Sequence, residues 1–505
     1  MPRTRVSRRV LSCLVVAVSL VAASTVPAAA EAGDLDGDGY DDLAIGVPDE
    51  DLGAAPDAGL VHVLRGSQRG IRTVRDVILT QQSFGGAPEP ADRFGGAIAY
   101  GDFDGDGRDD LALGAAAEDL FGLRDTGVVH VVYGANRGLV GRNQLLSQQG
   151  RIGGKPQAGD FFGAALAVGN FNGDRFDDLI IGVPGKDRRR GTRIAAGAVV
   201  VVYGGPQGLR PFGSRLFSQT GPVLGVPQDF DAFGVAVAAG DLNGDGFDDI
   251  AVGAPGEAIG GQPSAGQVHV LFGSRRGIQP AGNLVVRQSD AGGVVEAGDA
   301  FGRVVAVGDF DADGTDELAV SATGQSAAAG AVSVFDDGPA SPGRTLVPGE
   351  GTIPGVAEAG AEWGRSLAAG DFNGDGDDDL AVGAPFATAF GRSEAGSVTI
   401  IGGDAGGLGV PGGFVITQRE VRRTGLGAGD QFGWALRAGN FDGDDFVDLA
   451  VAARGKDRRN ADAGMVHVLP GSSSSIDPSR PRHIWQGISG IAERPESGDR
   501  LGTGL

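Results

Sequence analysis

Short apolar runs alternate with glycine-rich, polar stretches along most of the chain. In one example, GDFDGDGRDDLALG at residues 101–114, an acidic loop leads directly into an apolar run. A run that opens with Phe-Gly, FGGAIAYG from Phe94, precedes this loop, and a β-branched run, TGVVHVVYG from Thr126, follows it. No stretch has the 3.6-residue period of an amphipathic helix. The pattern predicts short β-strands joined by turns.

The acidic loop occurs seven times. Its first residue stands at positions 34, 102, 170, 241, 309, 371 and 440, in steps of 62 to 71 residues. A fourth, weaker strand contains glutamine in six units, at Gln82, Gln149, Gln219, Gln288, Gln418 and Gln486. Repeats of this length with four short strands each are typical of propeller blades. We therefore expect an all-β fold, a seven-bladed β-propeller of four-stranded blades.

The two chain ends complete one unit between them. The final residues DRLGTGL, 499–505, match DRFGGAI at residues 92–98. The first acidic loop lacks a preceding Phe-Gly strand, because the mature chain begins at Glu31, almost directly before the loop. We expect the N- and C-terminal segments to pair and close the ring, which removes exposed sheet edges.

Residues 1–30 have the pattern of a secretory signal peptide, which leaves residues 31–505 as a single propeller domain. Arginines precede an apolar run at residues 10–23, and three alanines at residues 28–30 resemble a cleavage site. Ser-Arg-Arg at residues 7–9 partly resembles a twin-arginine signal, so both the Sec and the Tat route stay open. We expect a secreted, extracellular protein without a membrane span after cleavage. An uncleaved amino-terminal anchor is the alternative.

Composition narrows the class of protein. The 92 glycines lack the three-residue period of collagen, and 41% hydrophobic residues are too many for a disordered chain. The formal net charge of −23 argues against nucleic acid or an anionic membrane as a partner. Cys13 is the only cysteine and lies in the signal segment, so the mature chain forms no disulfide. Stability outside the cell must come from packing or from metal.

The acidic loops have the ligand pattern of calcium sites. Oxygen-bearing side chains stand at positions 1, 3, 5 and 9 of every loop, and position 7 varies, as expected if only its backbone carbonyl is used. Calcium takes six to eight oxygen ligands, whereas the lack of His and Cys in the loops argues against zinc or copper. We predict up to seven Ca2+ ions, held by Asp34, Asp36, Asp38, Tyr40 and Asp42; Asp102, Asp104, Asp106, Arg108 and Asp110; Asn170, Asn172, Asp174, Phe176 and Asp178; Asp241, Asn243, Asp245, Phe247 and Asp249; Asp309, Asp311, Asp313, Thr315 and Glu317; Asp371, Asn373, Asp375, Asp377 and Asp379; and Asn440, Asp442, Asp444, Phe446 and Asp448.

Two alternatives to this metal site fit the sequence less well. An EF-hand needs a bidentate Glu at position 12, but this position is apolar in every loop, as at Leu113. A merely solvated acidic turn would explain one copy but not seven in the same phase. The third loop has Asn at positions 1 and 3 and Arg175 in place of the turn glycine, so it is predicted to bind most weakly, with the seventh loop intermediate. Metal binding is expected to couple to folding.

The Phe-Gly strand, the DxDxDGxxD loop and strand ends such as GVP at 46–48 and GAP at 253–255 and 383–385 together resemble the FG-GAP repeat family. This family includes the propellers of integrin α subunits and the propeller that follows the catalytic domain of glycosylphosphatidylinositol-specific phospholipase D. The resemblance covers essentially the whole mature chain, and it implies a seven-bladed propeller with calcium in its loops, used for extracellular binding. Acidic loops in every blade, and the lack of a stalk, a membrane span and an RGD tripeptide, depart from the integrin pattern.

Basic residues cluster in two loops between the predicted second and third strands. GKDRRRGTR at residues 185–193 recurs in part as GKDRRN at residues 455–460. These loops lie opposite the acidic loops, on the face that integrin-like propellers use for ligands. Basic side chains there could hold a carboxylated or sulfated glycan, and the candidates are Lys186, Arg188, Arg189, Lys456 and Arg458. Solvated loops without a ligand are the alternative.

No catalytic residues are predicted. His62, His130, His269 and His467 occupy the same third-strand position in four units, which indicates a structural role because a catalytic histidine should be singular. We expect a calcium-binding extracellular binding or adhesion protein that is a monomer, takes a protein or glycan ligand and does not bind nucleic acid. A secreted hydrolase or lyase with a cleft on the propeller face is the alternative function.

Overall fold

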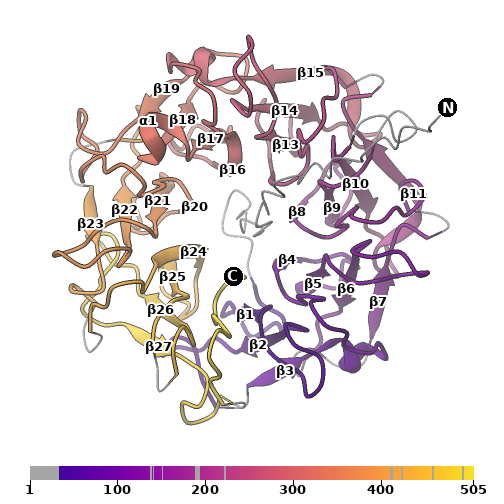
Figure 1. Cartoon of the computed structure of the whole chain (residues 1–505), viewed down its shortest axis with the longest axis horizontal. Coiled ribbons are helices and arrows are strands. Elements are labelled where there is room, and N and C mark those ends of the chain that lie inside the picture. Colours follow the sequence, from indigo (N-terminus) through magenta and orange to yellow (C-terminus); the bar gives the residue numbers. More distant parts are fainter. Residues whose placement is uncertain are drawn as a thin grey trace, which may run out of the picture.

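The structure is a computed structural model. It describes residues 33–505 apart from residue 75 and the segments 137–138, 140–141, 150–151, 188–193, 221–222, 410–412, 422–424, 458–459 and 492–493. Seven antiparallel sheets are arranged in a ring around a central axis (Figure 1). Six sheets have four named strands, and the sheet of the first blade has three. The predicted all-β, seven-bladed propeller is confirmed.

In each blade the strands run from the centre of the ring to its rim in chain order (Figure 1). The innermost strands are β4 (Ala97–Gly101), β8 (Leu166–Gly169), β12 (Val237–Gly240), β16 (Phe301–Gly308), β20 (Ser366–Gly370) and β24 (Phe432–Gly439). The second strands are β1 (Leu43–Val47), β5 (Asp110–Ala115), β9 (Asp178–Val183), β13 (Asp249–Ala254), β17 (Glu317–Ala322), β21 (Asp379–Ala384) and β25 (Asp448–Ala453).

The third strands are β2 (Leu60–Leu64), β6 (Val128–Val132), β10 (Ala198–Tyr203), β14 (Gln267–Phe272), β18 (Ala331–Phe335), β22 (Ser397–Ile401) and β26 (Met465–Leu469). The outer strands are β3 (Val77–Leu79), β7 (Asn143–Leu146), β11 (Arg210–Phe217), β15 (Gln279–Val286), β19 (Arg344–Leu346), β23 (Phe414–Ile416) and β27 (Arg482–Ile484). Helical turns are short: 3-10 helices at Gln81–Phe84 and Gln288–Ala291, and α1 at Gln325–Ala328.

The hydrophobic core lies between the blades. Every residue of β5 and β6 is buried, whereas three of the four residues of the outer strand β7 are exposed or half-buried. Between the second and third blades, Phe103 and Val129 pack with Leu166 and Val168. Strands that are buried on both faces form continuous apolar runs. This explains why the sequence predicts the second and third strands clearly, whereas the apolar pattern of the outer strands is weak.

The Phe-Gly dipeptide joins neighbouring blades. Phe162 N, at the start of the third blade, donates a hydrogen bond of 3.0 Å to Thr126 O of the second. The following residue, Gly163, lies against the end of β5: a Cβ added to Gly114 would stand 2.2 Å from Gly163 O. Glycine at this end of the second strand therefore allows two blades to approach each other closely.

The C-terminal segment takes the innermost place in the first blade. Gly46 N donates to Gly504 O (2.8 Å), and Gly502 N donates to Gly46 O (3.1 Å). Leu501 N donates to Ala463 O of the seventh blade (3.2 Å), which is the bond that a Phe-Gly phenylalanine makes in other blades. Gly502 and Gly504 thus pair with β1, in the place that the match of residues 499–505 to residues 92–98 predicts. Closure of the ring by pairing of the N- and C-terminal segments stays a prediction. The predicted signal peptide and the predicted N-terminal partner of this segment lie outside the described residues.

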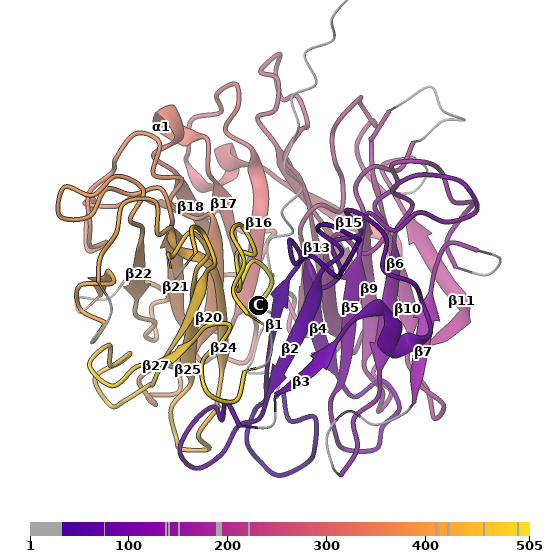
Figure 2. The same cartoon turned by 60° about the horizontal axis from the view of Figure 1, so that its bottom comes forward.

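The acidic loops and the turns between third and fourth strands share one face of the ring. Gly134 N, which follows β6, donates to Asp110 Oδ1 at the end of the second acidic loop (2.8 Å). The loops between second and third strands lie on the other face. The one that carries α1 is turned toward the viewer in Figure 1 and upward in Figure 2.

The glutamines that repeat in the folded chain differ by one residue from the predicted set in two blades. Gln81 and Gln148 are buried, whereas the adjacent Gln82 and Gln149 are exposed. Gln148 Oε1 accepts a hydrogen bond from Lys186 Nζ (3.3 Å). Where two glutamines are adjacent, a sequence does not indicate which one turns inward.

Candidate metal centres

In six of the seven acidic loops the first side chain accepts backbone hydrogen bonds and so organises a tight turn. In the second loop, Asp102 Oδ1 accepts from Gly105 N (2.7 Å) and Asp106 N (3.0 Å), and Asp102 Oδ2 accepts from Gly107 N (2.8 Å). Gly107 has a φ of +82°, which glycine adopts without a steric penalty. Asp106 Oδ1 in turn accepts from Arg108 N (3.1 Å). The backbone thus fixes the carboxylates of positions 1 and 5.

Position 9 begins the second strand and anchors the loop in the interior. Asp110 is buried, and its two oxygens accept from Gly134 N (2.8 Å) and Phe103 N (3.0 Å). Burial, reinforced by neighbouring carboxylates, raises the pKa of Asp110 to about 8 and that of Glu317 to about 9. Burial likewise raises the pKa of Asp42, Asp178, Asp249, Asp379 and Asp448 to about 7 or 8. A carboxylate whose charged form is disfavoured in this way is strongly stabilised by a nearby cation.

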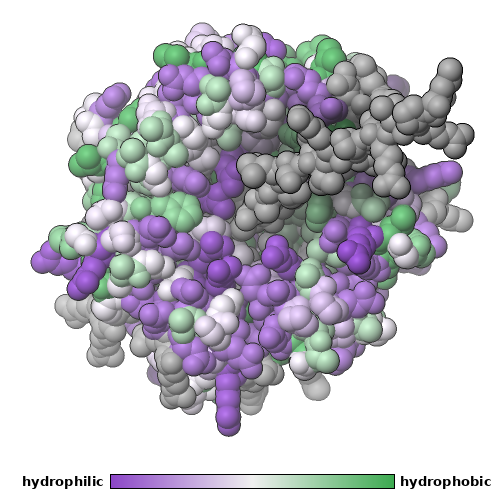
Figure 3. Space-filling model, viewed as in Figure 1, coloured by the Kyte–Doolittle hydropathy of each residue, from purple (hydrophilic) through white to green (hydrophobic). Residues whose placement is uncertain are grey.

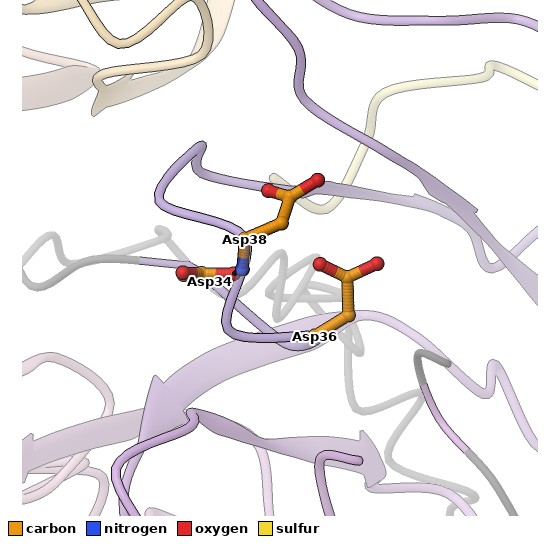
Figure 4. A group of neighbouring side chains, drawn as sticks. All are labelled: Asp34, Asp36 and Asp38. Atoms are coloured by element: carbon orange, nitrogen blue, oxygen red, sulfur yellow. Dashed lines mark hydrogen bonds between the residues drawn. The ribbon is translucent and has the colours of Figure 1, made fainter. Parts of the chain in front are cut away.

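Three loops bring carboxylate oxygens of three predicted ligands within 4.8 Å of one another: Asp34, Asp36 and Asp38; Asp102, Asp104 and Asp110; and Asp309, Asp311 and Glu317. Figure 4 shows the first group, whose side chains extend from one turn of the chain. Asp36 Oδ1, Asp104 Oδ1 and Glu317 Oε1 are buried and have no hydrogen-bond partner among the described residues. Unpaired buried oxygens are costly, and hard oxygen ligands at this spacing fit a divalent cation such as Ca2+.

The other four loops hold fewer carboxylates. Each has asparagine at position 1 or 3, and within the described ranges none of these loops brings three carboxylates together in the same way. In the third loop, Asn172 Nδ2 donates to Asp178 Oδ2 (3.2 Å), and in the seventh, Asn440 Nδ2 donates to Asp444 O (2.7 Å). These amides satisfy neighbouring oxygens from inside the protein, although Asn170 Oδ1 and Asp379 Oδ2 of these loops are also buried and have no hydrogen-bond partner among the described residues.

Arginines neutralise part of the charge in the first two loops. Arg65 Nη1 lies 2.5 Å from Asp36 Oδ2, and Arg142 Nη1 pairs with Asp104 Oδ2. In both cases the arginine contacts one oxygen of the position-3 carboxylate and the other oxygen, Oδ1, stays unpaired. The arginine side chains are 33% and 45% exposed, so they can move without disturbing the core.

Position 8, which the metal prediction did not use, links neighbouring loops. Asp109 Oδ2 accepts from Asp34 N (3.1 Å), and Asp109 N donates to Asp34 O (3.1 Å). The same two bonds join Asp41 of the first loop to Asn440 of the seventh (2.7 and 3.1 Å). The signal in the sequence was the recurrence of aspartate in six of seven loops, at Asp41, Asp109, Asp177, Asp248, Asp316 and Asp378. These hydrogen bonds make the acidic loops a connected ring.

Position 7 also contacts the preceding loop. A Cβ added to Gly105 would lie 2.7 Å from the Phe176 ring, and one added to Gly443 would lie 2.6 Å from the Tyr40 ring. The prediction that position 7 matters only through its carbonyl therefore misses a packing role for its side chain. Among the seven residues at this position, four are aromatic, and that is the signal that the sequence offered.

The lysines of the predicted glycan site are buried. Lys186 Nζ lies 2.6 Å from Asp160 Oδ2, and Lys456 Nζ lies 2.6 Å from Asp430 Oδ2; the lysine side chains are 4% and 10% exposed. Both ammonium groups are therefore buried in ion pairs inside the protein. Ligand binding by these loops would require them to face solvent. The other three candidates of that site, Arg188, Arg189 and Arg458, lie outside the described residues.

The four repeated histidines are buried in the third strands. Burial lowers the pKa of His130 to about 4 and that of His269 to about 3, so both are neutral near pH 7. The His130 ring packs edge-on against Phe94, and the His269 ring packs in the same way against Phe233. His130 and His269 thus pack beside the phenylalanines of the Phe-Gly dipeptides as part of the core.

Comparison with known proteins decides the family. The FG-GAP repeat model matches residues 26–64, 94–132, 162–202, 233–271, 301–335, 363–401 and 432–469, one segment for each acidic loop. The chain belongs to the FG-GAP repeat family. Each matched segment contains an acidic loop and the third strand that follows it, so the family pattern coincides with the candidate metal centres.

Relatives of this FG-GAP protein include integrin alpha pat-2 of Caenorhabditis briggsae, 34% identical over 245 residues, which are 46% of this chain and 18% of the relative. Phosphatidylinositol-glycan-specific phospholipase D of Mus musculus is 34% identical over 187 residues, which are 37% of this chain and 21% of the relative. The chain spans about a fifth of the length of these curated relatives.

Among solved structures, the Dos1 propeller aligns with a TM-score of 0.40 at 13% identity, over 77% of this chain and 72% of that one. A rhamnogalacturonan lyase of Bacillus licheniformis aligns with a TM-score of 0.36 at 11% identity, over 83% and 65%. In the described part of the FG-GAP chain, no helix has the length and apolar character needed to cross a bilayer.

Proposed function

We propose that this FG-GAP propeller is a secreted binding protein whose acidic loops hold Ca2+. The observation that carries the proposal is the set of buried, unpaired carboxylate oxygens, Asp36 Oδ1, Asp104 Oδ1 and Glu317 Oε1, each within a group of three close carboxylates. A calcium ion supplies the positive charge that these oxygens lack. The FG-GAP pattern, which implies calcium loops, supports the same assignment.

Calcium would act on the whole ring. In six loops position 9 ties the loop to the turn after the third strand, and position 8 ties it to the preceding loop, so an ion held at one loop strengthens contacts in two blades. The loops that begin at Asp34, Asp102 and Asp309 should bind most tightly because each offers three close carboxylates. The loop that begins at Asn170 should bind most weakly, because asparagine amides replace the carboxylates at positions 1 and 3.

The binding half of the proposal rests on the kind of relatives and on surface charge. Relatives of this chain include integrin alpha subunits. The resemblance to integrin-like propellers implies that a ligand would bind on the face opposite the acidic loops. A net charge of −23 disfavours nucleic acid, and the signal-like segment at residues 1–30 directs the chain out of the cell. We infer an extracellular adhesion or binding module, monomeric, that takes a protein or glycan ligand.

An array of glycans and matrix proteins, probed with the purified protein in calcium and in EDTA, tests this function. We expect calcium-dependent binding to at least one ligand without chemical change of that ligand. No binding in either buffer would contradict the binding role. Release of a cleaved product would instead indicate that the protein is a hydrolase or lyase.

A further inference from the structure

A cavity of about 370 Å3 lies at the centre of the face opposite the acidic loops. Its lining comes from six of the seven blades, which places it on the axis of the ring. Figure 3 shows this face, on which hydrophilic residues gather to the left of and below the centre. The charged residues of the lining are five arginines and two acids: Arg93, Arg303, Arg365, Arg454, Arg500, Asp49 and Glu362. In a chain with net charge −23, the centre of this face is therefore positive.

The internal repeats show that the fold does not require these arginines. Arg303 and Arg365 directly follow the Phe-Gly or Trp-Gly dipeptide, where the second and third blades have Gly96 and Ala164. Arg454 stands at the end of a second strand, where four other blades have proline. Equivalent positions of other blades hold small or apolar residues, so the blade fold as such does not require arginine at these places.

The positive charge is only partly balanced within the protein. Arg93 Nε and Arg500 Nη1 share one carboxylate, Asp49, at 3.8 and 3.5 Å. Among the described residues, neither Arg303 nor Arg454 forms a salt bridge with a carboxylate. Guanidinium groups that converge on a cavity without matching carboxylates attract an anion from solution.

Stacking fixes the direction of two of the guanidinium groups. Arg454 Cζ lies 3.0 Å and Arg365 Cζ lies 4.7 Å from the centre of the Trp434 ring. Arg454 Nε donates to Gln431 Oε1 (2.9 Å), and Arg365 Nη1 donates to Glu362 Oε2 (3.3 Å). Burial, together with the neighbouring arginines, lowers the pKa of Arg365 to about 10 and that of Arg454 to about 9. A stacked guanidinium keeps its remaining N–H donors in the ring-parallel plane, available to a planar oxyanion.

We propose that the central cavity binds a carboxylated saccharide, with Arg303, Arg365 and Arg454 pairing its carboxylate groups. The volume lies in the range of small-ligand sites and is too small for a folded partner. Phe161 and Phe386 supply apolar walls beside the arginines, as the apolar faces of a sugar ring require. The inference rests on the proposed binding function, and it gives that function a site and a ligand class.

Isothermal titration of the calcium-loaded full chain with trigalacturonate tests the site. Its methyl ester, with the same rings but no charge, is the ligand control. We expect Arg454→Gln and Arg365→Gln to weaken trigalacturonate binding about tenfold or more, since each removes a charge-assisted hydrogen-bond pair. Arg276→Gln, an exposed residue on the opposite face, makes the same charge change and should leave the Kd unchanged. Binding should weaken as NaCl is raised.

A second pair of variants tests the site at exposed residues, where a substitution is not expected to disturb folding. The Arg93 and Arg500 side chains are 54% and 43% exposed, so Arg93→Gln and Arg500→Gln can be made without opening the core and should weaken binding severalfold. Equal affinity for the ester, unchanged affinity in all four variants, or tight binding of hexaglutamate instead of the saccharide would each overturn the inference. Array binding to a neutral ligand would overturn it while leaving the proposed binding function standing, whereas no ligand on the array would remove that function itself.

Discussion

At the scale of single residues, the carboxylate at position 9 of each loop shows why a cation is expected. Asp110 is 1% exposed, and burial raises its pKa to about 8 from an ordinary value of 3.8. Its backbone hydrogen bonds favour the charged form but do not offset desolvation. Near neutral pH, the buried Asp110 carboxylate can stay ionised only if a cation replaces the stabilisation that water gives an exposed carboxylate.

This shift predicts that calcium stabilises the protein more at high pH than at low pH. In the metal-free protein, the folded-state pKa of Asp110 and Asp178, about 8, lies above the unfolded value. The folded state therefore binds the proton more tightly, and this stabilising contribution is full below pH 4 and is lost as pH rises through 8. Calcium binds the deprotonated form and reverses the loss.

Thermal unfolding at pH 5 and at pH 8, each with calcium and with EDTA, measures this effect. We expect the calcium-dependent rise in Tm to be clearly larger at pH 8. A rise of the same size at both pH values would mean that these buried carboxylates do not take part in binding.

At the scale of elements, contacts between blades depend on backbone approach at the end of the second strand. Gly114 faces the carbonyl of Gly163 in the next blade, and glycine occurs at this place in five blades, with Ser321 and Ala452 in the others. Strand order, turn positions and the glycine pattern were all predictable, because each is a local property of one repeat. The surface of the neighbouring blade that each glycine contacts could not be predicted, because that contact involves two repeats.

Gly114→Ala should lower the free energy of unfolding by about 1–3 kcal/mol, because the added Cβ would lie 2.2 Å from Gly163 O and the blades would have to separate. Gly425→Ala is the control, since a Cβ there meets no atom within 4 Å and the residue has no positive φ. Chemical unfolding in urea compares the two variants. Equal stability of both would contradict the role given to the glycine.

Contacts that involve two or more repeats also explain why the sequence did not reveal some of the functional residues. Position-8 aspartates contact the preceding loop, and the arginines of the central cavity come from blades that are up to about 400 residues apart in the chain. The spacing of oxygen ligands within a single loop was readable because the whole loop spans nine residues. The basic loops at Lys186 and Lys456 looked exposed in the sequence because nothing there marks Asp160 and Asp430 as their buried partners.

At the scale of the whole molecule, the first and seventh blades meet through two sets of contacts. Asp41 bonds to Asn440 on the acidic-loop face, and Leu501 and Leu505 fill the core beside Leu43. Leu501 and Leu505 are 0% and 1% exposed. These two C-terminal leucines are therefore part of the hydrophobic core of the first blade.

Leu501→Ala should lower the free energy of unfolding by about 2–5 kcal/mol, because a buried leucine leaves a cavity in the seam between the two blades. Val356→Ala, at an 83% exposed apolar residue, should change stability by less than about 0.5 kcal/mol. Removal of residues 499–505 should destabilise the chain further and promote aggregation through the open edge of the first sheet. A truncated chain with the Tm of the full one would contradict this account of the seam.

The most direct test of the central claim is the calcium content of the purified protein, measured together with its Tm before and after EDTA. The account predicts several calcium ions bound per chain, with those of the first, second and fifth loops retained longest, and a fall in Tm of more than about 10 °C when they are removed. A protein that binds no calcium from a millimolar solution and unfolds at the same temperature in EDTA would contradict it.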